Sequence, residues 1–362
     1  MRIFQILEFN QFDTGSVHQM FQAAAGLRER GHDVTVVSRP GAAMQAKAEE
    51  HGVRFEALPM RNAFDVVSAR KLARLLRGAD VVHVHKGVAH SLALMATLAQ
   101  PVGAFVVNRG VSFPLDRWNR AKFRTSRVDR IVTVCEQIRG VIIESGRLPP
   151  EKVVVVYAGT DVAQFDPARW DARAFRLEKG IPDERFLVGQ VGVRDWKGWK
   201  ELIDAIAPLP NVHVALIGCR NESEMNEVRH YGGERVTAVE VRGDMPRVFA
   251  SCDLVVDASW AGTGITGTIR EAMAMRKPVI ATDCGGNREL VSSPEVGWLI
   301  PPKDVAALTG AIAEVLEDPA RRARVAANAR EHVVRGFSKE LRITRLEELY
   351  AEIVGVRASR PR

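Results

Sequence analysis

The sequence has little of what marks several common protein classes. Its 362 residues include only four cysteines, which form no C-x-x-C pair and have no histidine at metal-binding spacing. Neither a disulfide framework nor a zinc site is therefore expected. No apolar run is long enough to span a bilayer, and no internal repeat or low-complexity tract is present. Met1–Glu8 is typical of a strand rather than of an exported leader, so the sequence predicts a cytoplasmic protein.

What remains is an ordinary globular composition with a basic excess. Hydrophobic residues make up 46% of the chain and charged residues 26%, which is typical of a folded soluble protein. The length predicts two domains. The net charge of +7 favours anionic partners such as nucleotides, nucleic acid or anionic lipid. Because no nucleic-acid recognition module accompanies this charge, a nucleic-acid partner is not expected.

The stretch from Cys252 to Leu290 contains the most informative local pattern. A short apolar run predicts a buried strand, Trp260–Gly267 predicts a glycine-rich turn, and the following residues predict a helix. Such a turn gathers free backbone N–H groups at the positive end of a helix dipole, so it favours a phosphate or diphosphate. Glu271 lies about one turn inside that helix, where its carboxylate can accept hydrogen bonds from ribose hydroxyls.

Three interpretations of this stretch remain open at the level of the motif. Gly262, Gly264 and Gly267 spell G-x-G-x-x-G, and Asp283 ends the next strand, which is close to the fingerprint of an NAD(P)-dependent oxidoreductase. The second interpretation is the nucleotide-sugar site of a glycosyltransferase. The third is a tightly packed strand-to-helix turn without a ligand.

Alternation of strands and helices along the chain predicts the fold class. From Arg2 to Val156, short apolar runs alternate with segments of helical periodicity, and the alternation resumes at Phe186. This pattern predicts an α/β protein with two doubly wound, Rossmann-like domains that face each other across a cleft. The expected boundaries are 1–165 for the first domain, 166–337 for the second, and 338–362 for a last helix that packs back towards the first domain, followed by a basic tail.

Ligands of such sheets gather beyond the carboxyl ends of the strands. A cleft between two such domains favours an enzyme over a single-domain binding protein, and the late position of the glycine pattern counts against an oxidoreductase. Polar or glycine residues stand at several predicted strand ends of the first domain: Gly15, His83, His85, Lys86, Asn108, Arg109 and Glu136.

Four ordered segments carry a family resemblance over nearly the whole chain. They are similar to motifs of the retaining GT-B glycosyltransferases of family four, the glycosyl transferases group 1. The matching segments are Gly15-Ser16 with Arg30–Val37, Ala158–Pro167, the loop with Arg194, Lys197, Gly198 and Leu202, and Glu271–Glu289.

The resemblance implies transfer of a sugar from a nucleotide-sugar donor, with a UDP-sugar favoured, and with retention at the anomeric carbon. The acceptor would be a glycan or lipid-linked precursor in cell-surface polysaccharide or lipopolysaccharide synthesis. No metal or cofactor is implied, because Arg194 and Lys197 would neutralise the leaving diphosphate. The implied donor-binding residues are Gly15, Ser16, Gly218, Arg242, Gly243, Asp244, Thr263, Gly264, Ile265, Thr266 and Glu271.

Two positions depart from the family pattern. Thr263 stands where the family carries the partner of Glu271, a second glutamate, and Arg109 stands where it usually carries a histidine. Arginine does not act as a base at neutral pH, although it can contact an anionic donor or acceptor group. Same-face retaining transfer needs no enzyme nucleophile, so these two substitutions do not exclude glycosyl transfer. The alternative is that this protein is a catalytically inactive relative that binds a nucleotide or a glycan.

Several assignments have an equally simple structural alternative. His83, His85 and Asn108 are candidates for the acceptor site, but a histidine at a strand end is as often structural. Lys197 can instead be a solvated loop cation, and Glu271 a surface glutamate of a helix.

The segment from Arg109 to Arg130 is rich in basic residues and contains Phe113, Trp118 and Phe123. It predicts an anion-binding surface for a phosphorylated or lipid-linked glycan, or a peripheral contact with the cytoplasmic leaflet. The alternative is a solvated helix of mixed charge.

Overall fold

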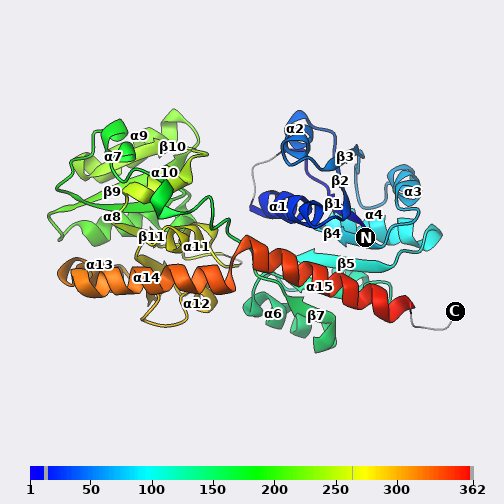
Figure 1. Cartoon of the computed structure of the whole chain (residues 1–362). Helices are drawn as coiled ribbons and strands as arrows, with labels where there is room; N and C mark the ends of the chain where they lie inside the picture. The colour runs from blue at the N-terminus through cyan, green and yellow to red at the C-terminus, as the bar shows by residue number, and fades with distance from the viewer. Residues whose placement is uncertain (12–14, 263, 359–362) are drawn as a thin grey trace. The chain divides into compact units, whose positions relative to one another are not determined.

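The structure is a computed structural model that describes residues 1–11, 15–262 and 264–358 (Figure 1). The chain divides into two compact units. The first unit consists of Met1–Gly159 together with the segment that begins at Lys339, and the second unit is Thr160–Ser338. Each unit contains one parallel sheet flanked by helices, so the predicted α/β class with two doubly wound sheets is confirmed.

The first unit contains a sheet of seven parallel strands in the order β3-β2-β1-β4-β5-β6-β7. The order changes direction between β1 and β4, which makes this the switch point where a crevice is expected. The strands are β1 (Arg2–Leu7), β2 (Asp33–Ser38), β3 (Arg54–Ala57), β4 (Val81–Val84), β5 (Ala104–Arg109), β6 (Arg130–Thr133) and β7 (Val153–Val155). The helices are α1 (Gly15–Glu29), α2 (Ala42–Glu50), α3 (Val66–Leu75), α4 (Gly87–Ala99), α5 (Arg117–Arg124), α6 (Glu136–Gly146) and α15 (Lys339–Ala358).

The second unit repeats this plan with six parallel strands in the order β10-β9-β8-β11-β12-β13. Its switch point lies between β8 and β11. The strands are β8 (Phe186–Val191), β9 (Val212–Cys219), β10 (Val236–Glu240), β11 (Leu254–Asp257), β12 (Val279–Thr282) and β13 (Trp298–Ile300). The helices are α7 (Ala174–Lys179), α8 (Trp199–Ile206), α9 (Glu222–Gly232), α10 (Met245–Ser251), α11 (Gly267–Ala274), α12 (Asn287–Leu290), α13 (Val305–Glu317) and α14 (Pro319–Gly336).

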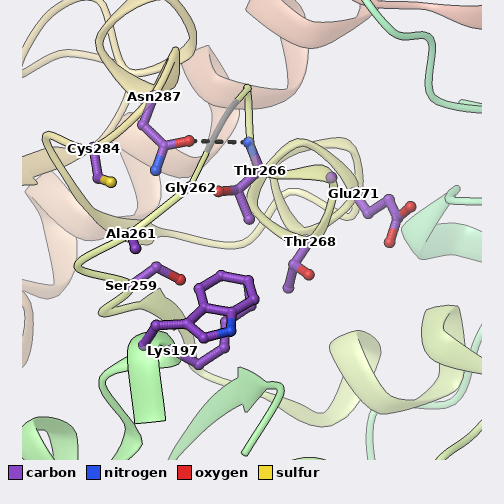
Figure 2. A pocket seen from close by; sticks show the side chains of 11 residues that line it. Lys197, Ser259, Ala261, Gly262, Thr266, Thr268, Glu271, Cys284 and Asn287 are labelled. Carbon is purple, nitrogen blue, oxygen red and sulfur yellow. Dashed lines mark hydrogen bonds between the residues drawn. The ribbon is translucent and has the colours of Figure 1, made fainter. Parts of the chain in front are cut away.

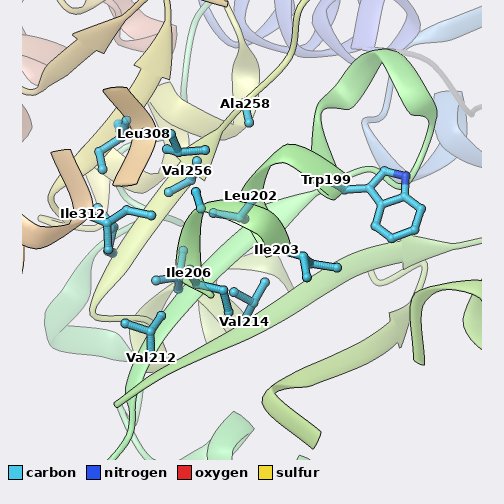
Figure 3. Close-up of a cluster of buried hydrophobic side chains, with 14 of the residues drawn as sticks. Trp199, Leu202, Ile203, Ile206, Val212, Val214, Val256, Ala258, Leu308 and Ile312 are labelled. Atoms are coloured by element: carbon cyan, nitrogen blue, oxygen red, sulfur yellow. The ribbon is translucent and has the colours of Figure 1, made fainter. Parts of the chain in front are cut away.

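The core of the second unit follows directly from the sequence pattern of α8. Trp199, Leu202, Ile203 and Ile206 recur at helical spacing and are all buried (Figure 3). One apolar stripe of this kind packs a helix against a sheet. The stripe contacts side chains of β9, β11 and α13, among them Val212, Val214, Val256, Leu308 and Ile312. This packing fixes the loop between β8 and α8, which carries Lys197.

The last helix, α15, contributes to the core of the first unit. Ile343, Leu346 and Tyr350 belong to the same buried cluster as residues of α1 and β1. The two helices approach closely at Gly26, where a Cβ atom would lie 2.0 Å from Cδ1 of Ile343. Within the described part of the chain, no helix combines the length and the apolar character needed to cross a bilayer.

Candidate functional site

A cavity of about 330 Å³ lies in the second unit beside the carboxyl end of β11 (Figure 2). This is the switch point of the sheet, where the loops after β8 and β11 diverge and ligands are expected. The cavity is lined by the turn η3 (Asp195–Lys197), the segment between β11 and α11, and residues around α12. The lining residues are Trp196, Lys197, Ser259, Ala261, Gly262, Thr266, Gly267, Thr268, Glu271, Cys284 and Asn287.

The carboxylate of Asp257, the last residue of β11, organises this cavity. Its side chain is 2% exposed and accepts hydrogen bonds from Oγ of Ser259 at 2.6 Å and Oγ1 of Thr266 at 2.7 Å. Nζ of Lys197 and Nδ2 of Asn287 each lie 3.4 Å from one of its oxygens. A buried carboxylate needs such partners, so Asp257 ties the three lining segments together.

The loop that carries Lys197 is pressed against the end of β11. The carbonyl of Lys197 accepts a hydrogen bond from Nε2 of Gln190 at 3.1 Å. Gly198 has a φ of +67°, and a Cβ atom there would lie 2.0 Å from the carbonyl oxygen of Ala258. Only glycine fits both the left-handed backbone and this close approach, which explains the Lys-Gly pair of the sequence.

The glycine-rich turn before α11 is hydrogen-bonded to α12 and to the loop that precedes α12. Oδ1 of Asn287 accepts a hydrogen bond from the amide of Thr266 at 3.0 Å (Figure 2), so this predicted phosphate-binding amide already has a partner. The carbonyl of Gly264 accepts from the amide of Gly286 at 3.2 Å. In the described residues, the amides of Gly264 and Ile265 donate no hydrogen bond. Thr263 lies outside the described residues.

Glu271 faces the cavity from the second turn of α11. Burial raises the pKa of its carboxyl to about 7, although the neighbouring Arg270 guanidinium acts in the opposite direction. Arg270 is itself buried, and its Nε donates to Oγ1 of Thr160 at 2.7 Å. The charge of Glu271 can therefore change near neutral pH.

Other predicted donor-binding residues of the second unit do not line the cavity. Arg194 is exposed and directly precedes the turn η3, and Gly218 has a φ of +105° near the end of β9. The Arg242 guanidinium is bound by the carboxylates of Asp244 and Glu178, whose hydrogen bonds raise its pKa. The side chain of Arg242 is thus committed within the protein, which leaves the main chain around Gly243 as the part able to meet a ligand.

In the first unit, His83 and His85 are buried parts of the core. Nδ1 of His83 lies 2.6 Å from the Tyr350 hydroxyl, Nε2 of His85 lies 2.6 Å from Oε1 of Gln5, and the two rings stack at 4.5 Å. Burial lowers the pKa of His83 to about 3 and that of His85 well below its usual value. The structural interpretation fits these surroundings, and a role with the acceptor stays a prediction.

The remaining predicted residues of the first unit lie at strand and helix ends. Gly15 and Ser16 begin α1, and Asn108 and Arg109 end β5. The structure thus brings Lys197, Thr266 and Glu271 together in one cavity of the second unit.

The residues that support this cavity were not predicted from the sequence. Asp257, Ser259 and Asn287 were not singled out, although two signals were present. Asp257 directly follows the apolar run Leu254–Val256, and Asn287 directly follows the Gly285-Gly286 turn. A carboxylate at a strand end and an amide after a tight turn are both suited to bind exposed loop atoms.

Comparison with known proteins identifies the family. The Glycosyltransferase Family 4 model matches residues 14–164, and the Glycosyl transferases group 1 model matches residues 185–318. These matches cover both units. The chain belongs to this family of glycosyltransferases, and its fold is of the GT-B class. The family assignment made from the sequence is confirmed, and the oxidoreductase alternative is set aside.

Two relatives and one solved structure are similar to this chain. The D-inositol 3-phosphate glycosyltransferase of Stackebrandtia nassauensis is 26% identical over 316 residues, which cover 78% of this chain and 70% of the relative. The lipopolysaccharide core biosynthesis mannosyltransferase LpsB of Rhizobium meliloti is 29% identical over 240 residues, 59% of this chain and 66% of the relative. The crystal structure of Anabaena HepE in complex with UDP superposes with a TM-score of 0.86 at 22% identity, covering 97% of this chain and all of that one.

Proposed function

We propose that this glycosyltransferase binds a UDP-sugar in the cavity of the second unit and transfers its sugar, with retention, to a glycan or lipid-linked acceptor. The observation that carries the proposal is the meeting of Lys197, the start of α11 and Glu271 around one cavity. These are a cation, a set of helix-start amides and a carboxylate, which are the groups that a nucleoside diphosphate needs.

Each group has a distinct role in this proposal. Nζ of Lys197 approaches Asp257 only to 3.4 Å, so the ammonium remains able to bind the diphosphate and to stabilise the charge that develops as it leaves. Arg194 supplies a second cation from the same loop. Glu271 accepts hydrogen bonds from the ribose hydroxyls. Arg109 acts on the acceptor side, in the first unit.

No metal ion is required for this chemistry. The leaving diphosphate is neutralised by Lys197, Arg194 and the amides at the start of α11. Asp257 is the fully buried carboxylate beside the cavity, and it is already hydrogen-bonded by Ser259 and Thr266.

Similar proteins support the donor and the pathway. The crystal structure of HepE is a complex with UDP, which supports a uridine nucleotide here. LpsB is named for lipopolysaccharide core biosynthesis, which supports a role in cell-surface glycan synthesis. The Stackebrandtia relative is named for a phosphorylated acceptor.

Peripheral contact with the inner face of an anionic membrane is part of the proposal. Phe113 is 66% exposed and Trp118, in α5, is 75% exposed. The Arg117 guanidinium lies 5.3 Å from the centre of the Trp118 ring. An exposed aromatic and basic helix of this kind suits an anionic lipid surface.

Thermal stabilisation by nucleotides tests the donor site. We expect UDP and UDP-sugars to raise the unfolding temperature, NAD(P) to have no effect, and Lys197→Ala to weaken UDP binding about tenfold or more, since one charge-assisted contact contributes roughly 1.5–3 kcal/mol. Lys200→Ala is the matched control, because Lys200 pairs with Glu227 at 3.0 Å and does not line the cavity. Equal UDP affinity in Lys197→Ala and wild type would refute this placement of the diphosphate.

A further inference from the structure

A second group of polar side chains lies in the first unit, at the switch point of its sheet. β1, β4 and β5 are parallel neighbours, so their carboxyl ends meet at one edge. Glu8 follows β1, Lys86 follows β4, and Asn108 and Arg109 end β5. Crevices at such points bind ligands.

Two of these side chains have buried polar atoms that lack partners. Nη2 of Arg109 donates to the carbonyl of Phe113 at 2.8 Å, but Nε of Arg109 is buried and bonds to no described residue. Oδ1 of Asn108, one residue earlier, is also buried without a partner in the described part of the chain. Unsatisfied buried donors and acceptors are costly and uncommon. Successive side chains of a strand face opposite sides of the sheet, so the free donor of Arg109, which lies on the side of Phe113, is the atom that suggests a missing ligand here.

Lys122 adds a third cation to this edge. Its Nζ lies 3.3 Å from Oγ of Ser91, in α4. Desolvation lowers the pKa values of Lys122 and Arg109. The carboxylate of Asp116 opposes this shift for both cations and that of Glu8 opposes it for Lys122, whereas the charge of Arg109 lowers the pKa of Lys122 further. The two cations are therefore near enough to repel each other, and the described residues provide no ion pair for Lys86, Arg109 or Lys122.

Two carboxylates, Glu8 and Asp116, act on these cations without forming an ion pair in the described residues, and each also accepts hydrogen bonds from backbone amides. Glu8 accepts hydrogen bonds from the amides of Val88 and Ala89, at 3.2 and 3.1 Å. Asp116 accepts from the amides of Trp118 and Asn119. Each carboxylate caps the start of a helix.

Two arginines at the opposite edge of this sheet, near the amino end of β6, form ion pairs. Arg130 binds Glu352 at 2.7 Å, and Arg357 binds Asp129 at 2.8 Å.

We propose that Lys86, Arg109 and Lys122 bind a phosphate group carried by the acceptor. A guanidinium suits the oxygens of a phosphate, since it offers directed, charged donors. Arg109 thereby sets acceptor specificity, and the histidine usual at this position would carry less charge at neutral pH. This inference rests on the proposed glycosyltransferase function and names the chemical class of its acceptor.

Calorimetry on the full chain tests the inference with a matched pair of probes, inositol 3-phosphate and inositol. We expect the phosphorylated probe to bind at least tenfold more tightly than inositol, and Arg109→Gln to remove this preference. Arg109→Lys should restore part of it, and Lys122→Gln should weaken it in the same direction. Lys71→Gln, at an exposed position of α3, should behave as wild type.

UDP titration separates a failure of this inference from a failure of the proposed function. Arg109→Gln should bind UDP as wild type does, because the donor cavity lies in the second unit. Normal UDP binding with no phosphate preference overturns the inference alone.

Vesicles distinguish a soluble phosphate from a lipid headgroup. Binding to phosphatidic acid vesicles but not phosphatidylcholine, lost in Arg109→Gln, assigns the phosphate to a lipid-linked acceptor. Binding of the soluble probe alone assigns it to a free one. Binding of neither, or binding that Arg109→Gln does not change, refutes the site.

Discussion

Glu271 occupies a part of the cavity where burial makes a negative charge costly. Its pKa in the folded protein is about 7, above the ordinary value of about 4.3. Between these two values the unfolded chain loses its proton while the folded one keeps it. The group therefore stabilises the free enzyme fully at low pH, and this contribution is lost as the pH rises towards 7.

Replacing Glu271 with glutamine tests this titration. Glutamine cannot ionise, so Glu271→Gln should be as stable as wild type near pH 4 and more stable above pH 7, by roughly 1–3 kcal/mol. Denaturant unfolding of both proteins across this pH range measures the difference between their free energies of unfolding. The contributions of the other titrating groups cancel in this difference. A difference that does not change with pH would show that Glu271 is not buried as described.

The same substitution should weaken the donor complex despite the gain in stability. A carboxylate accepts ribose hydroxyls more strongly than a neutral amide does, so UDP affinity of the wild type should rise through pH 7. Such an exchange of stability for function is expected of site residues. An affinity that stays constant with pH in the wild type would argue against the ribose contact.

At the scale of elements, the loop between β8 and α8 depends on Gly198. Gly198→Ala would place a methyl group 2.0 Å from the Ala258 carbonyl, at a φ of +67°. Gly180 offers a matched control, because its φ is +65° and a Cβ atom there meets nothing within 4 Å. Gly180→Ala should lower the free energy of unfolding only by the penalty for a left-handed backbone, about 1 kcal/mol.

We expect Gly198→Ala to lower the free energy of unfolding by about 2–4 kcal/mol, clearly more than this control, because the loop must move away from β11. It should also weaken UDP binding, since the displaced loop carries Lys197. Urea unfolding and calorimetry of both variants measure these effects. If the two alanine variants were equally stable and bound UDP equally, the close packing of this loop would be disproved.

The helices and strands could be predicted from the sequence better than the contacts between the segments that connect them. The apolar runs of β1 and β11 and the helical stripe of α8 predict buried elements, because burial on a parallel sheet needs those periodicities. The support by Asp257 and Asn287 could not be predicted, since it depends on loops that are distant in sequence meeting at one strand end. For His83 and His85, strand position alone did not show that Tyr350, in α15, would bind His83 or that Gln5 would bind His85.

At the scale of the whole molecule, two separate cores should respond separately to mutation. The Tyr350 hydroxyl lies 2.6 Å from Nδ1 of His83 and accepts a hydrogen bond from Nε2 of Gln5 at 3.2 Å. Tyr350→Phe leaves these buried groups without that partner, which should cost about 1–3 kcal/mol. Only the first unit should be destabilised, because α15 belongs to it.

Calorimetric unfolding with and without UDP measures this separation. Tyr350→Phe should lower the unfolding temperature of the first unit and leave the dissociation constant of UDP unchanged. A weaker UDP complex in this variant would mean that α15 influences the donor cavity, contrary to the description of two cores.

The central claim is that the cavity beside Asp257 holds the diphosphate of a nucleotide sugar. A crystal structure of the full chain with a UDP-sugar tests it most directly. The account predicts a phosphate oxygen within about 3 Å of Nζ of Lys197, the helix α11 start facing the diphosphate, and the ribose hydroxyls on the carboxylate of Glu271. A diphosphate bound away from Lys197, with Glu271 facing no ribose, would contradict it.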